Sequence, residues 1–167
     1  FGSNYYNRSS VCYDPPNEGG ALRSQDLETN GDSLAYDGTL LRLNDDGTIP
    51  VDNPGATETP PHPIIAYGLR NPFRFSFRPN SSEIYIADVG WNSWEEINVF
   101  ETTDLQPSLR NYGWPCYEGF LVQQSYAATG SSICSSVYNG ASLSRITAPI
   151  LAYHHCLPMP TLEATDI

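Results

Sequence analysis

The sequence contains no lysine and little charge of either sign. Among its 167 residues, eight are cationic and all eight are arginine, whereas 19 are Asp or Glu, so the formal net charge is −11. This balance argues against nucleic acid and anionic membrane surfaces as partners. We attribute most of the excess to plain surface acidity, but acidic side chains also supply the oxygen ligands that hard cations such as Ca²⁺ accept.

The chain also lacks long hydrophobic runs and a sustained helical period. No apolar stretch approaches the length of a membrane span, and neither an initiator Met nor a signal peptide is present. We therefore expect no membrane span, and we interpret the chain as a piece of a longer protein. No stretch repeats its apolar residues at helical spacing over three turns, which argues against long amphipathic helices.

Cysteine is scarce, and its spacing excludes the CxxC pairs of zinc and redox sites, since the four residues are Cys12, Cys116, Cys134 and Cys156. Two sequons, at Asn7 and Asn80, mark candidate glycosylation sites. Together these features favour an oxidising, secreted (extracellular or periplasmic) location. Four cysteines allow three complete connectivities, and we favour Cys116 with Cys134 because they flank a single loop-like stretch.

Turn formers and β formers are abundant instead. The chain has 11 Tyr, 6 Phe and 3 Trp, with 13 Gly and 14 Pro to separate short strands. Alternation of apolar with other residues, or a short apolar run, predicts strands at 39–43, 64–67, 73–77, 83–89, 95–100 and 149–154. Short strands at this spacing indicate an antiparallel all-β meander, for which sandwich, barrel and propeller all remain possible.

The composition divides the chain into four parts. Residues 1–38 read mostly as loop, and residues 39–122 hold most of the predicted strands. Residues 123–147, rich in Ser, Gly, Ala and Asn, read as a surface excursion, and 148–167 as a strand followed by a tail. The three Trp residues could form a sugar-binding platform, but packing is the commoner role for such residues at strand and turn positions.

Several motifs occur in an order that resembles one known family. They include Glu18-Gly19-Gly20-Ala21-Leu22-Arg23-Ser24-Gln25-Asp26-Leu27, Asp37-Gly38-Thr39-Leu40-Leu41-Arg42-Leu43, Tyr67-Gly68-Leu69-Arg70-Asn71-Pro72-Phe73-Arg74-Phe75, Ala87-Asp88-Val89-Gly90, Trp94-Glu95-Glu96-Ile97-Asn98 and Asn111-Tyr112-Gly113-Trp114-Pro115-Cys116-Tyr117-Glu118-Gly119. Their order and spacing resemble the soluble glucose/sorbosone dehydrogenase family, whose fold is a six-bladed β-propeller. The resemblance covers roughly residues 18–155 and implies two to three blades within one partial propeller domain.

The resemblance implies oxidation of a sugar by hydride transfer to the cofactor PQQ, which Ca²⁺ holds in place. By position, Arg70 and Asn71 become the catalytic and cofactor-binding candidates. A guanidinium suits this role because it stays protonated and offers several donors in one plane. Gly90 and Trp91 become candidates to offer main-chain carbonyls to the catalytic Ca²⁺. Glu96 and Tyr112 match a structural Ca²⁺ site, Glu96 through its carboxylate and Tyr112 through its main chain.

The resemblance also implies that part of the active site lies outside this chain. The family's catalytic histidine falls before Phe1, and further cationic PQQ contacts fall after Ile167, whereas His62, His154 and His155 match nothing catalytic. Partners are then a small sugar and the remainder of the propeller. An alternative is a secreted propeller of the same fold that serves as a non-catalytic binding module, like the hedgehog-interacting-protein-like group, with a protein partner. An unrelated β-sandwich adhesion domain is a third alternative.

Overall fold

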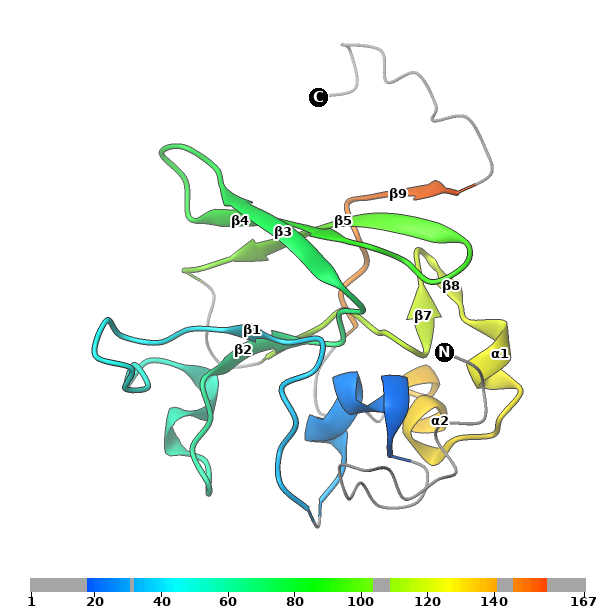
Figure 1. Cartoon of the computed structure of the whole chain (residues 1–167), viewed down its shortest axis with the longest axis horizontal. Helices are drawn as coiled ribbons and strands as arrows, with labels where there is room; N and C mark the ends of the chain where they lie inside the picture. The colour runs from blue at the N-terminus through cyan, green and yellow to red at the C-terminus, as the bar shows by residue number, and fades with distance from the viewer. Residues whose placement is uncertain (1–17, 31, 104–108, 141–145, 156–167) are drawn as a thin grey trace.

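The computed structural model describes residues 18–30, 32–103, 109–140 and 146–155. A four-stranded antiparallel sheet dominates it, in the order β3-β4-β5-β9. The strands are β3 (Pro72–Phe77), β4 (Glu83–Asp88), β5 (Trp94–Glu101) and β9 (Leu151–His154). Figure 1 shows this sheet above a smaller one. The smaller sheet has the order β1-β2-β6, formed by β1 (Leu40–Leu41), β2 (Ile64–Tyr67) and β6 (Arg110–Asn111).

The inner face of β4 and β5 changes from apolar to polar along its length. Cross-strand pairing sets Ile84 opposite Phe100, Ile86 opposite Asn98, and Asp88 opposite Glu96. Since directly opposed residues share a face, these six side chains lie in two rows on one side of the sheet. We call the Ile84–Phe100 end the apolar end and the Asp88–Glu96 end the polar end.

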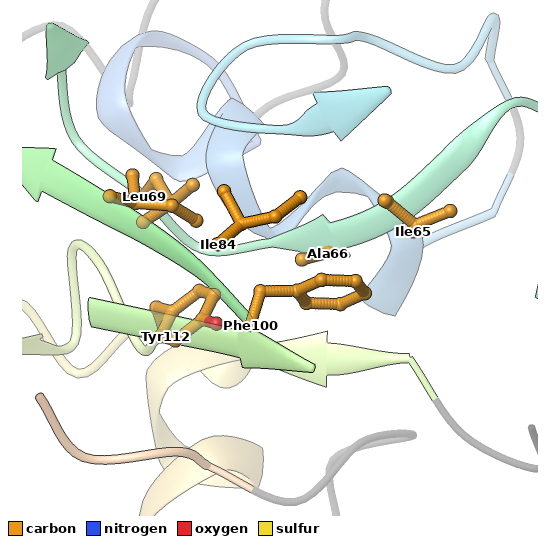
Figure 2. Packing of buried hydrophobic residues seen from close by; sticks show 7 residues of the cluster. Ile65, Ala66, Leu69, Ile84, Phe100 and Tyr112 are labelled. Carbon is orange, nitrogen blue, oxygen red and sulfur yellow. The ribbon is translucent and has the colours of Figure 1, made fainter. Parts of the chain in front are cut away.

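The apolar end forms the main core. Ile84, Ile86 and Phe100 pack with Ile65, Ala66 and Leu69 of the β2 segment and with Tyr112, all of them buried. Figure 2 shows Ile84 and Phe100 beside Ala66, with Tyr112 close by. Every residue of β2 is buried, which explains its uninterrupted apolar sequence. This packing fixes where β2 ends, and therefore where the residues that follow it lie.

A buried polar junction joins three distant parts of the chain just after β2. The amides of Gln25 and Asn111 hydrogen-bond reciprocally, at 2.9 and 2.7 Å. Gly68 donates its N–H to Ser24 O and accepts from Trp114 N, at 3.0 and 2.8 Å. Gly68 has φ +76°, and a Cβ there would lie 2.2 Å from Asn111 Oδ1, so glycine is required. The junction thus links residues that belong to separate sequence motifs.

The remaining elements form a helical corner held by a disulfide. They are η1 (Gly20–Glu28), α1 (Gln124–Ala127), α2 (Ser132–Tyr138) and the hairpin of β7 (Tyr117–Glu118) and β8 (Leu121–Val122). η1 and α2 pack against each other, as Figure 1 shows. Cys116 and Cys134 are bonded, which confirms the favoured pairing. Cys12 and Cys156 lie outside the described residues, as does Asn7.

Within the segment expected to be mostly loop, the described residues include η1, a 3-10 helix. The structure departs from the sequence-based expectations in two places. Part of the stretch expected as a surface excursion folds into α1 and α2, and it buries Ile133, Cys134 and Val137. β2 and β6 pair in parallel rather than antiparallel fashion. The helices are too short to repeat a helical pattern, which is why periodicity missed them.

An exposed edge strand and a short 3-10 segment complete the fold. The edge strand β3 exposes Phe75 and Phe77, which are 58% and 61% accessible. A short 3-10 segment, η2 (Pro54–Thr57), precedes β2 and packs against it. Within the described ranges, none of the helices has both the length and the apolar character needed to cross a membrane.

Candidate functional site

The loop between β2 and β3 carries Arg70 and Asn71, and a buried carboxylate holds it. Asp88, at the end of β4, accepts the N–H of Arg70 at 2.9 Å and that of Asn71 at 2.6 Å. Asp88 is only 5% exposed. Burial raises the pKa of Asp88 to about 6, although these hydrogen bonds and the charge of Arg70 lower it. Asp88 therefore fixes the main chain at both predicted cofactor contacts.

The Arg70 side chain is directed toward the loop that follows β4. Its Nη1 donates to the carbonyl of Val89 at 2.8 Å, and its guanidinium lies 5.5 Å from the ring centroid of Trp114. Val89 in turn donates its N–H to Asn71 O at 3.0 Å. A guanidinium over an indole face is a favourable cation–π arrangement. These contacts bring Arg70, Asn71 and Gly90 together, three of the residues that the motifs singled out.

The loop of residues 90–94 is wrapped around a second buried carboxylate. Glu118 Oε1 accepts four consecutive N–H groups, from Trp91, Asn92, Ser93 and Trp94, at 2.8, 3.0, 3.1 and 3.3 Å. Such a concave run of N–H groups is an anion-binding nest. A Cβ on Gly90 would lie 1.4 Å from Trp94 O, so the loop can close only with glycine at this position.

Glu95 connects this loop to the end of β9. Its Oε2 accepts the N–H of Gly90 at 3.0 Å, and its Oε1 lies 2.8 Å from His155 Nε2. His155 also donates its N–H to Ser93 O at 2.9 Å. His155 is thus a neighbour of the loop, although its sequence context suggested no role.

Glu96 lies at the polar end of the inner face among other carboxylates. Its Oε1 accepts from Gly119 N and its Oε2 from Asn98 Nδ2, at 2.5 and 3.1 Å. Burial raises the pKa of Glu96 to about 7; the two hydrogen bonds lower it, and Asp88 and Glu118 raise it further. The ionised form of Glu96 is therefore disfavoured in this buried place, and a bound cation would favour it.

An unsatisfied buried oxygen adjoins Glu96. Asn98 is fully buried, and its Oδ1 has no hydrogen-bond partner. Leaving such an oxygen unpaired is costly, and a cation is one group that could satisfy it. Tyr112 donates its hydroxyl to Val99 O at 2.8 Å. The Tyr112 side chain therefore points into the core, and its N–H donates to Tyr67 O at 2.9 Å, which leaves the main-chain carbonyl as the group that could ligate a cation.

Side chains alone do not build a metal centre in the described ranges, since no group of three or more His, Cys, Asp or Glu residues there could hold a metal ion. The available donors are mainly carbonyl, amide and carboxylate oxygens, the set that Ca²⁺ prefers. The donor chemistry thus fits Ca²⁺ at Gly90 and Trp91, and at Glu96. An arginine with an adjacent exposed amide, Asn71, fits a ligand that carries acceptor oxygens, as a quinone does.

The aromatic residues near the site pack against one another. Trp91, Trp114 and Tyr126 form edge-on pairs with centroids 5.9 to 6.1 Å apart. Trp114 and Tyr126 are buried, so these two have little surface left to stack on a sugar. Asn80 occupies an exposed turn between β3 and β4 with φ 59°, a position accessible to modification.

Sequence reasoning quoted Asp88 and Glu118 within motifs but gave neither a role. The sequence did contain a sign of a role for Asp88, because Ile84, Ile86 and Asp88 alternate along one strand and therefore share one face of the sheet. An acidic residue in that series is a buried charge that needs partners. The sequence contains no comparable sign for Glu118, since its hydrogen-bond partners lie 24 to 27 residues away.

A family model and several known proteins match the chain. A family model described as glucose / sorbosone dehydrogenase matches residues 20–157. Quinoprotein glucose dehydrogenase B of Acinetobacter calcoaceticus is 37% identical over 123 residues, which are 70% of this chain and 24% of the relative. The HIPL2 protein of Arabidopsis thaliana is 34% identical over 110 residues, which are 65% of this chain and 14% of the relative.

Among solved structures, a PQQ-bound aldose sugar dehydrogenase from Streptomyces coelicolor aligns with a TM-score of 0.46 and 23% identity. That alignment covers 70% of this chain and 26% of the other. The chain thus spans about a quarter or less of the length of these relatives.

Proposed function

Because the chain belongs to the glucose / sorbosone dehydrogenase family, we propose that it is a segment of a PQQ- and Ca²⁺-dependent sugar dehydrogenase. Its all-β fold is then one stretch of the family's β-propeller, two to three blades of a six-bladed ring within one partial domain. The observation that carries the proposal is the double link through Val89, which joins the Arg70-Asn71 loop to the Gly90 loop.

Arg70 and Asn71 are assigned to the cofactor. PQQ, when bound, supplies a quinone that accepts hydride from the sugar. Arg70 holds a permanent positive charge beside the loop, where it stabilises negative charge that develops on a neighbouring oxygen. Its anchors, Val89 O and the Trp114 ring, restrict its rotamers before the cofactor arrives. Asn71 offers an amide donor from the adjacent position, and Asp88 fixes the main chain of both residues.

Cations are assigned to two places. The carbonyls of Gly90 and Trp91 hold the Ca²⁺ that binds with the cofactor. Glu96, through its carboxylate, and Tyr112, through its main chain, hold a structural Ca²⁺, and the unpaired Oδ1 of Asn98 supports a cation there. Oxygen ligands of this mixture are typical of Ca²⁺ in proteins.

The protein's environment and partners follow from the same proposal. A Cys116–Cys134 disulfide and an accessible sequon at Asn80 support a secreted or periplasmic location. The substrate class is a small sugar, and the remainder of the propeller is the partner that covers Phe75 and Phe77 on the edge strand. The catalytic proton acceptor comes from that remainder.

A second candidate function is a non-catalytic extracellular binding module of the same fold. The match to HIPL2 supports this second candidate, because HIPL2 is 34% identical to this chain and the quinoprotein is 37% identical. In that case the Ca²⁺ sites persist while sugar oxidation is absent, and the partner is a protein.

Dye reduction by the full-length protein separates the two. After loading with PQQ and Ca²⁺, we expect an aldose to reduce an artificial electron acceptor. The Arg70→Ala variant should lose most of this activity, about a hundredfold or more by analogy with removing one donor to developing charge. Arg78→Ala is the matched control, since Arg78 pairs with Glu83 away from the site. A fully metal-loaded wild type that reduces no dye supports the binding module instead.

A further inference from the structure

The carboxylate of Glu118 determines which way the carbonyls of the 90–94 loop point. Four successive N–H groups of this loop converge on one oxygen, Glu118 Oε1. Glu118 is 4% exposed, so water does not compete effectively for these donors. A charged acceptor forms stronger hydrogen bonds than a neutral one. The loop is therefore built around an anion.

Peptide geometry determines where the carbonyls of this loop point. In a trans peptide the N–H and C=O bonds point in opposite directions. The only cis peptides in the described part of the chain are Thr59–Pro60 and Trp114–Pro115, so the loop peptides are trans. When the N–H groups of residues 91–94 face Glu118, the carbonyls of residues 90–93 must face away from it.

Two of those carbonyls are the ones assigned to Ca²⁺. Ser93 O accepts a hydrogen bond from the N–H of His155, and the carbonyls of Gly90 and Trp91 likewise lie on the side of the loop away from Glu118. We propose that Glu118 is a positioning residue that orients the Gly90 and Trp91 carbonyls toward the cation. This inference rests on the proposed function, and it adds a residue that touches neither cation nor cofactor.

Glu118 is itself held from two sides, as a positioning residue must be. It lies in the β7–β8 hairpin, two residues after Cys116, which is bonded to Cys134 of α2. The next residue, Gly119, donates its N–H to Glu96 Oε1. The hairpin is therefore tied to α2 by the disulfide and to the main sheet through Glu96, so both cation positions depend on one short segment.

The test uses the full-length protein with Ca²⁺ alone as the probe. Glu118→Gln keeps the shape but removes the charge, so a neutral amide oxygen must replace the carboxylate oxygen as the acceptor of four N–H groups. Glu118→Asp keeps the charge but withdraws it by one methylene. Glu101→Gln is the matched control, because the Glu101 carboxylate accepts from Thr103 and takes no part in the loop. Affinity is measured by calorimetry, and hydrogen exchange of amides 91–94 is followed in metal-free protein.

We expect Glu118→Gln to weaken Ca²⁺ binding at one site by about tenfold or more, as loss of an outer-shell contact does. We also expect faster exchange confined to amides 91–94, with Glu118→Asp intermediate and Glu101→Gln like wild type. If Glu118→Gln does not fold, the Ca²⁺ affinity and amide exchange of Glu118→Asp are compared with those of wild type instead. Wild-type affinity and exchange in a folded Glu118 variant overturn this inference and leave the proposed function standing. A wild type that binds no Ca²⁺ overturns the calcium assignment and this inference together.

Discussion

The two ends of the inner face formed by β4 and β5 have the same backbone pairing but opposite chemistry. At the apolar end, Ile84 and Phe100 pack beneath β2 and contribute to the core. At the polar end, Asp88 and Glu96 occupy equivalent opposed positions, and their oxygens accept main-chain N–H groups from loops. One strand pair thus serves both packing and loop placement. The comparison predicts that mutations at the apolar end affect stability, whereas mutations at the polar end affect ligand binding more than stability.

Truncation at the apolar end should have the largest effect on stability. Phe100 is almost fully buried. We expect Phe100→Ala to lower the free energy of unfolding by about 3–5 kcal/mol, because it leaves a cavity in the core. Phe100→Leu, which keeps most of the volume, should cost less than about 1.5 kcal/mol. Denaturant unfolding of the full-length protein measures both, and equal losses would contradict the packing described.

Removal of the Cys116–Cys134 disulfide should come next. The bond closes a loop between residues 18 apart in sequence, for which a loss of about 2–4 kcal/mol is expected in the Cys134→Ser variant. Because the bond also holds the hairpin that carries Glu118, amides 91–94 should exchange faster in this variant. Thermal unfolding and hydrogen exchange test the two parts separately. Unchanged exchange would show that the hairpin keeps Glu118 in place without the bond.

At the polar end, Asp88→Asn should affect binding more than stability. The substitution removes the charge that accepts the N–H groups of Arg70 and Asn71. We expect a stability loss of about 1 kcal/mol, since the burial cost of a charge is also removed, and about a tenfold loss of PQQ affinity, corresponding to about 1.4 kcal/mol. Asp46→Asn is the control, because Asp46 is exposed and bonds only Thr48 in its own turn. A larger effect on unfolding than on PQQ titration would break the comparison between the two ends.

The smallest effect is expected where Arg70 meets Trp114. Trp114→Phe keeps an aromatic ring but weakens the cation–π contact, which contributes about 0.5–1 kcal/mol at such sites. PQQ affinity should fall about two- to fivefold, as that energy implies. Trp94→Phe is the matched control, because Trp94 packs on His154 and not on Arg70. If both variants titrate with PQQ alike, the indole does not help to place Arg70.

Much of the main sheet could be predicted from the sequence. β2 to β5 were located because alternation or a continuous apolar run marks strands of this length, and Pro72 and Asp88 lie within one or two residues of the predicted ends. β6, β7 and β8 are two residues each, too short to carry a pattern. α2 has seven residues, about two turns, and gives no period.

The site was predictable only where its residues lie in quoted motifs. Arg70 and Asn71 lie in one motif and Gly90 in another, and only the resemblance indicated that these two motifs belong to one site. Glu118 could not be found in this way, because its partners depend on how the hairpin returns to the loop. The unpaired Oδ1 of Asn98 likewise could not be predicted, because only the three-dimensional packing shows that this oxygen is buried away from water.

A crystal structure of the full-length protein with PQQ and Ca²⁺ tests the central claim most directly. The account predicts a cation about 2.3–2.6 Å from the carbonyl oxygens of Gly90 and Trp91, as Ca²⁺ coordination requires. It also predicts the quinone beside Arg70 and Asn71, with the N–H groups of residues 91–94 still directed at Glu118. A cation or quinone bound away from these two loops, or carbonyls of Gly90 and Trp91 turned toward Glu118, would contradict it.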